Sequence, residues 1–356
     1  MGDNQMGNKM WKAGLAVPAC LAVLSACGND QTEGANENGM ENELVIYSTH
    51  AEEMIEMVAN AFEEETGVEV TYINLMGELA ERVEAEMDNP QADIMFGGAS
   101  NLFMDLKEKG AFTPAEPEWG SSMDPMFKDE DGYWYGTIQT PVSLFYNTEM
   151  LSEDELPSDW SDLADDQYQD LLIFRNALSS SARVMYASLL QQYDQEGNLD
   201  EGWAFLNDLD ANTKAYFDSG TLQMQAIGRQ EAAISFSTMN HVLDNQINHD
   251  LPIEIIDLES GFPVITDAIA MIEGAPNPNA AEAFLEFAGS AEIQGMLAQE
   301  FNRMPTNEEA LSLSPDWMQD ITFNVMDVDW DHLAEHQADW MQTWDTDVKD
   351  SEKDVE

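Results

Sequence analysis

The sequence predicts an α/β protein of two lobes joined by two crossing strands. Apolar strands alternate with amphipathic helices in the first part of the chain, and the same alternation resumes further on. Between the two series lies the apolar stretch Thr140–Met150 (TPVSLFYNTEM). A second apolar stretch, Gly261–Ile272 (GFPVITDAIAMI), follows the second series. Two crossings of this kind predict a cleft between the lobes.

The first series has the order strand, helix, strand, helix, strand, helix. Its strands are predicted at Leu44–Tyr47, Val68–Asn74 and Asp93–Phe96. The first helix shows an apolar face from Met54 to Phe62, and the other two are expected at Glu78–Met87 and Asn101–Lys109. This order predicts a parallel sheet with right-handed crossovers, in which ligands bind at the carboxyl ends of the strands.

The second series also alternates predicted strands with predicted helices. Strands are predicted at Leu171–Phe174, Lys214–Phe217, Ala232–Phe236 and Ile253–Leu258, with helices at Ala182–Gln192 and Leu199–Leu209 and another after Ser219. Two helices, Ala280–Ala288 and Ala291–Glu300, follow the second crossing, and a C-terminal helix carries Trp340 and Trp344 on a stripe that should pack against a lobe. We therefore assign residues 43–141 and 264–311 to lobe 1, and residues 142–263 and 312–349 to lobe 2.

The charge balance is extreme and limits the possible partners. Thirteen Lys and Arg residues stand against seventy Asp and Glu residues, which gives a formal net charge of -57. Nucleic acids and anionic membranes are bound by clustered cations, so neither is an expected partner. Because the chain is also 44% hydrophobic and clearly periodic, we expect a folded protein with an acidic, hydrated surface suited to high salt, not a disordered chain.

The N-terminal segment reads as an export signal. Lys9 and Lys12 precede the apolar run Ala13–Ala26, which is too short to span a bilayer. It ends in Leu-Ser-Ala-Cys, which resembles the lipobox of bacterial lipoproteins and makes Cys27 the expected lipidated residue. We expect residues 1–27 to be a signal peptide, residues 28–42 to be a flexible tether, and the protein to be anchored to the outer face of the cell membrane or in the periplasm. An N-terminal core helix is the alternative.

Several predicted helices begin with small or hydroxyl residues, and such ends can hold anions. The backbone N–H groups and the helix dipole supply local positive potential there, although a simple helix cap is the alternative at any single end. The candidate ligand-binding residues are Thr49, His50, Gly77, Glu78, Gly98, Ala99, Ser100, Arg175, Ser179, Ser180, Ser181, Arg183, Ser219, Thr221 and Asn240. Arg175 and Arg183 flank three consecutive serines, so this group is the strongest candidate.

Motifs for catalysis, cofactors and metals are missing from the sequence. It contains no G-x-S-x-G, no Walker A loop and no G-x-G-x-x-G, and carboxylates are too common here to indicate acid and base catalysis. His332 and His336 have metal-ligand spacing, but we favour a solvated helix face. We expect no enzyme activity, no cofactor and no resident metal. A cleft hydrolase and a sensory protein that presents its ligand remain as alternatives.

Six segments together resemble the extracellular solute-binding proteins of ABC importers. They are Val45–His50 (VIYSTH), Ala61–Val70 (AFEEETGVEV), Ala92–Ala99 (ADIMFGGA), Val142–Asn147 (VSLFYN), Ala268–Ala275 (AIAMIEGA) and Phe301–Pro305 (FNRMP). The resemblance is greatest to the branch with ferric-ion, thiamine, and phosphorylated-sugar or phosphonate binders. It implies a type II periplasmic-binding-protein fold, a monomer whose lobes close on a small-molecule solute, and an ABC permease as partner.

The resemblance also bears on the solute. His50 matches a histidine that ferric-ion binders use as a ligand, so His50 would be the metal ligand if the chain were an iron carrier. Gly97 and Gly98 stand where those proteins carry a glutamate, and Ile234–Met239 (ISFSTM) lacks their tyrosine pair. Asn176–Arg183 (NALSSSAR) resembles an N-x-L-A-S-G-T loop of related binders, with its Gly and Thr replaced. We therefore expect a small phosphate- or carboxylate-bearing solute, with ferric ion as the alternative.

Overall fold

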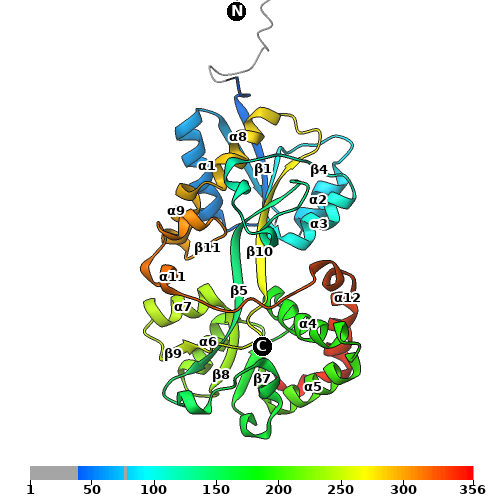
Figure 1. Cartoon of the computed structure of the whole chain (residues 1–356), viewed down its shortest axis with the longest axis vertical. Coiled ribbons are helices and arrows are strands. Elements are labelled where there is room, and N and C mark those ends of the chain that lie inside the picture. The colour runs from blue at the N-terminus through cyan, green and yellow to red at the C-terminus, as the bar shows by residue number, and fades with distance from the viewer. Residues whose placement is uncertain (1–38, 76–77, 356) are drawn as a thin grey trace, which may run out of the picture.

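Two lobes are stacked along the long axis of the molecule (Figure 1). The computed structural model describes residues 39–75 and 78–355. Strands β5 (Tyr135–Asn147) and β10 (Val264–Ile272) run from one lobe to the other. They pair with each other in antiparallel fashion, with Val264 opposite Pro141. The two crossings expected from the sequence are therefore present and lie side by side.

The sheet of lobe 1 is centred on β1 (Glu43–Ser48), which pairs in parallel with β2 (Glu69–Asn74) and β3 (Ile94–Ala99). Alternate side chains of a strand point to opposite faces of its sheet. Leu44 and Ile46 accordingly pack into one apolar cluster with residues of α1 and α8, whereas Tyr47 packs into a second cluster with residues of α2 and α3. The remaining elements of this lobe are α1 (Glu52–Thr66), α2 (Leu79–Ala85), α3 (Ser100–Glu108), β4 (Phe112–Thr113), α8 (Pro278–Ala288), α9 (Ala291–Phe301), β11 (Met304–Pro305) and α10 (Glu308–Leu311).

Lobe 2 repeats this design around β6 (Leu172–Arg175), which pairs in parallel with β7 (Thr213–Phe217) and β8 (Ile234–Thr238). Phe174 faces the cluster that contains residues of α4 and α12, and Ile173 faces the cluster formed by α6 and α7. The other elements are α4 (Ser180–Gln195), α5 (Leu199–Asn212), α6 (Gly220–Gly228), α7 (Met239–Asn248), β9 (Ile253–Ile255), α11 (Asp316–Asp320), α12 (Trp330–Thr343) and β12 (Asp354–Val355).

The carboxyl ends of both sheets point toward the junction of the lobes. On lobe 2, the last residue of β8, Thr238, lies opposite Val142, next to the crossing. On lobe 1, the last residue of β3, Ala99, lies opposite Asp267, three residues from the start of β10. In the order β12-β7-β6-β8-β5-β10-β3-β1-β2, the two crossing strands therefore lie between the two sets of parallel strands, whose carboxyl ends are the edges where ligands bind in sheets of this kind.

Most expected elements are present, but several have other bounds than predicted and some elements were not predicted. The first crossing strand begins at Tyr135 instead of Thr140, and β3 extends through Gly97 and Gly98. Helix α7 was not predicted, because in Met239–Asn248 (MNHVLDNQIN) only Met239, Val242 and Leu243 are buried, which is a weak apolar pattern. The C-terminal stripe packs as expected, since Trp344 is fully buried and stacks on Tyr186 with ring centroids 4.6 Å apart.

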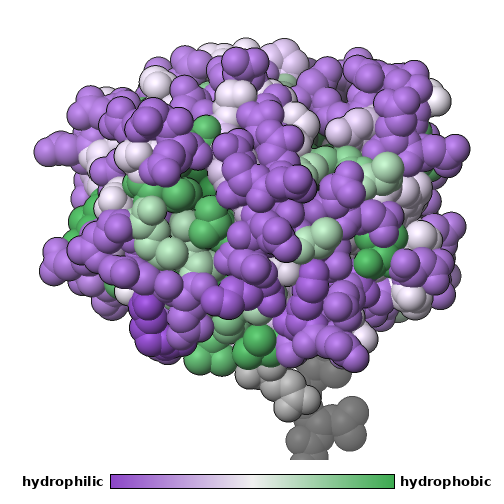
Figure 2. Space-filling view, turned by 90° about the horizontal axis from the view of Figure 1, so that it is seen from below, coloured by the Kyte–Doolittle hydropathy of each residue, from purple (hydrophilic) through white to green (hydrophobic). Residues whose placement is uncertain are grey.

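The face of the molecule seen in Figure 2 is mostly hydrophilic, with a few separate hydrophobic patches. No helix within the described part of the chain is long and apolar enough to cross a membrane. Cys27, the expected signal peptide and most of the expected tether lie outside the described residues.

Candidate functional site

The lobe 1 wall of the cleft is formed by the loop after β1. His50 is only 4% exposed, and its ring meets the edge of Phe96 at a centroid distance of 4.5 Å. Its backbone is held at both ends, because its N–H donates to Ser48 Oγ at 3.1 Å and its carbonyl accepts from Asn74 Nδ2 at 2.6 Å. Its ring nitrogen Nε2 is buried and has no hydrogen-bond partner among the described residues. A buried nitrogen of this kind is a candidate ligand contact.

Two consecutive glycines close this wall at the end of β3. Gly97 and Gly98 have φ angles of 95° and 97°, in the region that favours glycine. A Cβ atom on Gly97 would lie 2.9 Å from His50 Nε2 and 2.9 Å from Thr49 Oγ1. Glycine at this position therefore allows the backbone to approach the His50 ring directly.

The charges on this wall are unusual. Burial and the nearby Arg303 guanidinium lower the pKa of His50 to about 3, so the imidazole is neutral at physiological pH. Burial raises the pKa of Asp267, although Arg303 and a hydrogen bond from the Gly98 N–H act in the opposite direction. Lobe 1 thus offers a neutral imidazole, a guanidinium and a carboxyl group of raised pKa at the edge of the cleft.

The lobe 2 wall is built around Arg175, the last residue of β6. Its Nε donates to the Phe217 carbonyl at 3.2 Å, and its Nη2 donates to the Asp218 carbonyl at 2.9 Å. A Cβ atom on Gly220 would lie 2.8 Å from Arg175 Nη1, so glycine at the start of α6 makes room for the guanidinium. Burial lowers the pKa of Arg175, and an arginine remains charged despite such a shift.

His241 of α7 stands beside this arginine. Its Nδ1 lies 3.1 Å from Ser237 Oγ, and the Gly220 Cβ position lies 3.4 Å from its Cε1. Burial lowers the pKa of His241, Asp244 opposes that shift, and Arg175 adds to it. The imidazole therefore acts as a polar, uncharged neighbour of Arg175 near neutral pH.

Among the arginines of residues 39–75 and 78–355, those near the cleft are the ones for which no ion pair is found. Six of the basic residues in the described part of the chain have a carboxylate within 4.0 Å, namely Arg82, Lys107, Lys109, Arg229, Lys349 and Lys353. No ion pair is formed within the described residues by Arg175, Arg183 or Arg303. In a chain with seventy acidic residues, these three positive charges are left available to an anion.

Two cavities lie where the lobes meet. One, of about 400 Å³, is lined by Asn101 of α3 on lobe 1 and by Asn176, Leu178 and Arg183 of lobe 2, together with side chains of α12. The other is a narrow space at the hinge between Arg303 and Asn240. The Oδ1 atom of Asn240 is buried and has no partner among the described residues.

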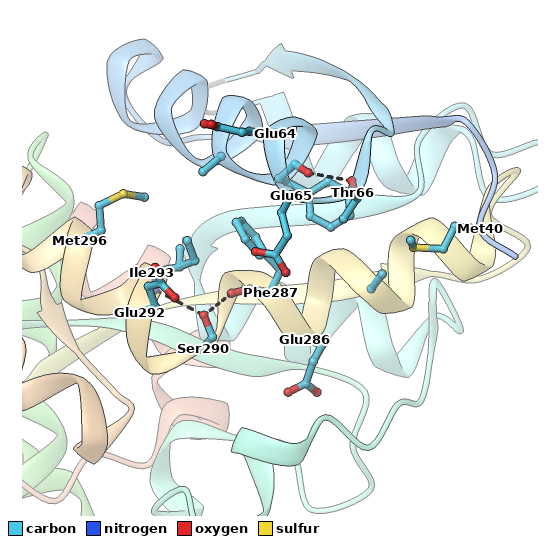
Figure 3. A pocket seen from close by; sticks show the side chains of 13 residues that line it. Met40, Glu64, Glu65, Thr66, Glu286, Phe287, Ser290, Glu292, Ile293 and Met296 are labelled. Carbon is cyan, nitrogen blue, oxygen red and sulfur yellow. Dashed lines mark hydrogen bonds between the residues drawn. The ribbon is translucent and has the colours of Figure 1, made fainter. Parts of the chain in front are cut away.

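A larger cavity, of about 720 Å³, lies on the outside of lobe 1 (Figure 3). Its side chains come from α1 on one side and from α8 and α9 on the other. The charged residues of its lining are all acidic, Glu64, Glu65, Glu286 and Glu292. This cavity is the larger one, but it does not suit the anionic solute expected from the sequence, because its four carboxylates would repel an anion.

The candidate residues are distributed unevenly. Thr49, His50 and Gly98 come together on lobe 1, Arg175 and Ser219 flank Gly220 on lobe 2, and Asn240 reaches the hinge. Ala99 and Ser179 precede the first residues of α3 and α4, and Ser179 Oγ lies 3.0 Å from Ser181 Oγ. Ser100 and Ser181 are buried, whereas Glu78, Ser180, Arg183 and Thr221 are exposed. Thr221 lines a groove with Arg229 and His249, away from the residues of the cleft walls. Gly77 lies outside the described residues.

Two details differ from the expected helix ends. Helix α1 begins at Glu52, not at Thr49 or His50, and its first turn carries Glu52 and Glu53. Two carboxylates at this helix start offset its partial positive charge. The expected α2 end is a helix of seven residues that starts at Leu79. These two ends therefore offer less local positive potential than those of α3, α4 and α6.

Sequence reasoning did not select Arg303, Asp267, His241 or Ser237. Asp267 had a recognisable signal, because it is the one acidic residue within the apolar strand Val264–Ile272 (VITDAIAMI). Arg303 lies in the segment FNRMP and is one of only thirteen basic residues. His241 carried no signal, since α7 itself was not predicted.

No group of three or more His, Cys, Asp or Glu residues that could hold a metal ion occurs in residues 39–75 and 78–355.

Comparisons with known proteins agree on one family. The family model described as bacterial extracellular solute-binding protein matches residues 89–336. A probable ABC transporter periplasmic-binding protein, y4fP of Sinorhizobium fredii, is 29% identical over 311 residues, which cover 86% of each chain. The apo ferric ion-binding protein A of Pasteurella haemolytica superposes with a TM-score of 0.72 at 20% identity, over 85% of this chain and 97% of that one. The AfuA protein of Actinobacillus pleuropneumoniae, solved with fructose-6-phosphate, gives a TM-score of 0.65 at 21% identity, over 86% and 98%.

Proposed function

The chain belongs to the family of bacterial extracellular solute-binding proteins, and from this premise we propose that it captures a small organic anion between its lobes. It is the solute-binding protein of an ABC transporter, and it has the type II periplasmic-binding-protein fold. The solute we propose carries a phosphate or a carboxylate group. The proposal rests above all on the three arginines near the cleft that form no ion pair within the described residues, although the chain carries a net charge of -57.

Each wall supplies donors suited to an oxyanion. Arg303 and Arg175 approach the cleft from lobe 1 and lobe 2, and arginine can bind a phosphate or carboxylate through two parallel hydrogen bonds. The starts of α3, α4 and α6 add backbone N–H groups. Closure about β5 and β10 would then exclude water and strengthen these interactions.

The test compares an arginine near the cleft with an exposed arginine that already has an ion pair. Arg303→Gln should weaken solute binding by about tenfold or more, because a hydrogen bond to a charged group contributes roughly 1.5–3 kcal/mol. The matched control is Arg229→Gln, which removes the same charge from an exposed arginine paired with Glu231 on lobe 2. Native mass spectrometry of the purified protein identifies the retained solute, and calorimetry then measures its affinity for both variants. Equal affinity of Arg303→Gln and wild type would contradict the proposal.

Ferric ion is the second candidate, and one observation favours it. His50 Nε2 is buried, neutral and without a partner among the described residues, and a neutral imidazole nitrogen is a common metal ligand. The solved structure from Pasteurella haemolytica is that of a ferric ion-binding protein. However, ferric ion prefers several hard oxygen ligands, and the described residues do not bring three potential ligands together. Calorimetry with ferric ion and no organic anion separates the candidates, because tight binding of the bare ion would favour the iron carrier.

We also propose that the protein is a monomer tethered to the outer face of the membrane through Cys27, and that it delivers its solute to an ABC permease. Cys27→Ala should move the protein from the membrane fraction to the soluble fraction, and unchanged retention in membranes would contradict the lipid anchor.

Permease genes beside this gene would favour transport over a sensory role. The relatives are transport binding proteins, which weighs against the hydrolase alternative. Turnover of the retained solute would revive that alternative.

A further inference from the structure

A small cavity of about 180 Å³ lies in lobe 2, at the carboxyl end of α4. Its lining includes Tyr193 and Glu196 of α4, Phe205 of the neighbouring helix α5, and Asp159 and Trp160 (Figure 1). The opposite end of α4 is the one near the cleft, and it lies about 20 Å from Tyr193 at 1.5 Å per helical residue. Pockets for drug-sized ligands measure about 300–1,000 Å³, so a ligand of this cavity has to be smaller.

Three aromatic rings of this lining are fixed by the fold. Tyr193 stacks on Phe205, with ring centroids 5.8 Å apart and an angle of 28° between the rings. Gly202 of α5 permits this approach, because a Cβ atom there would lie 3.0 Å from Tyr193 Cβ. Trp160 is held by its Nε1, which donates to the Gly261 carbonyl at 2.9 Å. The faces of such rings attract a cation that comes within about 6 Å.

The charges around the cavity are negative. Asp159 and Glu196 line it, and burial raises the pKa of Tyr193, which the carboxylates of Glu201, Glu196 and Asp159 raise further. Within residues 39–75 and 78–355, none of these three carboxylates forms an ion pair. The last turn of α4 contains no basic residue, and the helix dipole places partial negative charge at this end. Each of these features favours a cation.

Elsewhere in this fold, an aromatic ring and a carboxylate together hold a cation of the chain itself. The basic group then lies 5.2–5.8 Å from the ring centroid. The arrangement is formed by Arg82 with Glu86 and Tyr47, by Lys107 with Asp129 and Tyr133, and by Lys349 with Asp354 and Tyr216. At the end of α4 the rings and carboxylates are present, but no basic side chain of the described residues lines the cavity. The cation that would complete the arrangement has to come from solution.

We propose that this cavity is a second ligand site, outside the cleft, that binds a small organic cation of the quaternary ammonium type. Its alkyl groups would contact the three rings, and its charge would be balanced by Asp159 and Glu196. A bare metal ion suits the lining less, because the described residues bring no three metal-ligating side chains together. The net charge of -57 attracts such a cation at long range. Binding here does not depend on the anion proposed for the cleft.

Choline and 3,3-dimethyl-1-butanol are matched probes for this site, because they share one shape and differ in a cationic nitrogen against a neutral carbon. Calorimetry on the full-length protein in 1 M sodium chloride measures both affinities, since a screening length of about 3 Å suppresses general attraction to the acidic surface. Wild type should bind choline about tenfold or more tightly than the alcohol, because only the cation gains from the rings and carboxylates.

Tyr193→Leu removes one ring and keeps apolar bulk, so the preference for choline should fall to about twofold or less. Tyr72→Leu is the matched control. Tyr72 is also half-buried near two carboxylates, Glu52 and Glu56, but it does not line the cavity. This variant should keep the preference of wild type.

A carboxylate variant keeps the test valid if Tyr193→Leu does not fold. Glu196→Gln changes an exposed side chain of the lining and should weaken choline binding by about threefold, with no effect on the alcohol. Glu282→Gln removes the same charge from an exposed position on α8 of lobe 1 and should leave choline binding unchanged.

Three results would overturn the cation site. The first is that wild type binds the alcohol as tightly as choline, or binds neither probe. The second is that folded Tyr193→Leu binds choline as wild type does, because the cation then binds elsewhere. The third is that Glu196→Gln and Glu282→Gln weaken choline binding equally, which would assign the effect to net charge. None of these results bears on the anion of the cleft, which Arg303→Gln tests separately.

Discussion

At the scale of single residues, His50 links the proposed binding site to the pH dependence of stability. Its pKa falls from 6.5 to about 3, chiefly through burial and further through Arg303. Below pH 6.5 the unfolded chain therefore binds a proton that the folded protein does not, so stability falls as pH falls from 6.5 toward 3. Between pH 6.5 and pH 5 this single group removes about 2 kcal/mol, at about 1.36 kcal/mol per pH unit.

We expect His50→Gln to reduce this acid sensitivity. The variant lacks the buried imidazole, so its loss of stability between pH 6.5 and pH 5 should be smaller than that of wild type by about 1–2 kcal/mol. Chemical denaturation at the two pH values measures both losses. His249→Gln is the control, because the side chain of His249 is 62% exposed. Equal pH dependence of His50→Gln and wild type would argue against a neutral, buried His50.

A second prediction at this scale concerns Gly97. Gly97→Ala should lower the stability of the fold for two reasons. Alanine disfavours the φ angle of 95°, and its Cβ would lie only 2.9 Å from atoms of His50 and Thr49. Gly110→Ala is the matched control, since Gly110 has a φ angle of 79° but nothing within 4 Å of the added Cβ.

The comparison of the two glycine variants isolates the contact with His50. The strained backbone alone costs about 1–3 kcal/mol in either variant. Gly97→Ala should lose more stability than Gly110→Ala in urea denaturation, and it should also weaken solute binding in calorimetry. Equal losses, with normal binding, would mean that the His50 ring moves aside without consequence.

The sequence predicted some of these residues and missed others for physical reasons. Thr49, His50 and Gly98 could be predicted because they follow strands whose apolar character is plain. Arg303 and Asp267 are single charges next to apolar residues, and only the tertiary fold brings Arg303 near His50 across about 250 residues of chain. Exposure was equally unpredictable, since Ser180 is exposed while its neighbour Ser181 is buried.

At the scale of secondary-structure elements, Asp93 links three of them on lobe 1. It precedes β3, is fully buried, and accepts hydrogen bonds from the N–H of Val45 at 2.7 Å and from the N–H and Nδ2 of Asn277 at 2.7 Å and 3.0 Å. Strand β1 and the start of α8 are thereby fixed to β3. Since β1 leads into Thr49 and His50, this link also positions the cleft wall.

We therefore expect Asp93→Ala to lower the free energy of unfolding by at least about 3 kcal/mol, because it leaves buried N–H groups unpaired at about 1–3 kcal/mol each. Denaturant titration measures the loss. Asp257→Ala, at an exposed position, should stay within about 0.5 kcal/mol of wild type. A loss below about 1 kcal/mol for Asp93→Ala would show that water or another group replaces the carboxylate.

Elements were more predictable where they have one plainly apolar face. Strand β1 and helix α1 were expected nearly in full, because Leu44, Ile46, Met54 and Phe62 follow the strand and helix periods. Helix α7 buries few apolar residues, and the extension of β5 to Tyr135 depends on its pairing with β10. Pairing between distant segments is a tertiary effect that local patterns do not contain.

At the scale of the whole molecule, the placement of the few positive charges matters more than their number. Most of the described basic side chains lie in ion pairs with carboxylates, as Lys107 does with Asp129 at 2.6 Å. The cleft arginines, Arg175, Arg183 and Arg303, lie among polar groups and form no such pair with a carboxylate in the part of the chain that the structure describes. Under the proposed function, the molecule would combine a long-range field that repels anions with a local site that binds them.

The final prediction follows from that long-range field, because seventy acidic residues against thirteen basic ones repel one another throughout the folded protein. The repulsion extends over about 30 Å at 0.01 M salt but only about 3 Å at 1 M salt. Unfolding moves the charges apart, so low salt favours the unfolded chain. We expect the thermal midpoint to rise with sodium chloride from 0.01 M to 1 M, with most of the rise in the lower part of that range, where the screening length changes most.

A differential scanning calorimetry series in sodium chloride tests this prediction, with sucrose at matched osmolality as the control. Sucrose is excluded from protein surfaces but does not screen charge, so it separates the two effects. Screening predicts a larger rise in sodium chloride than in sucrose. A flat or falling midpoint in sodium chloride, or an equal rise in sucrose, would mean that carboxylate repulsion does not control the stability of this fold. In that case the acidic residues would affect stability mainly through the hydration of the surface and not through the repulsion between their charges.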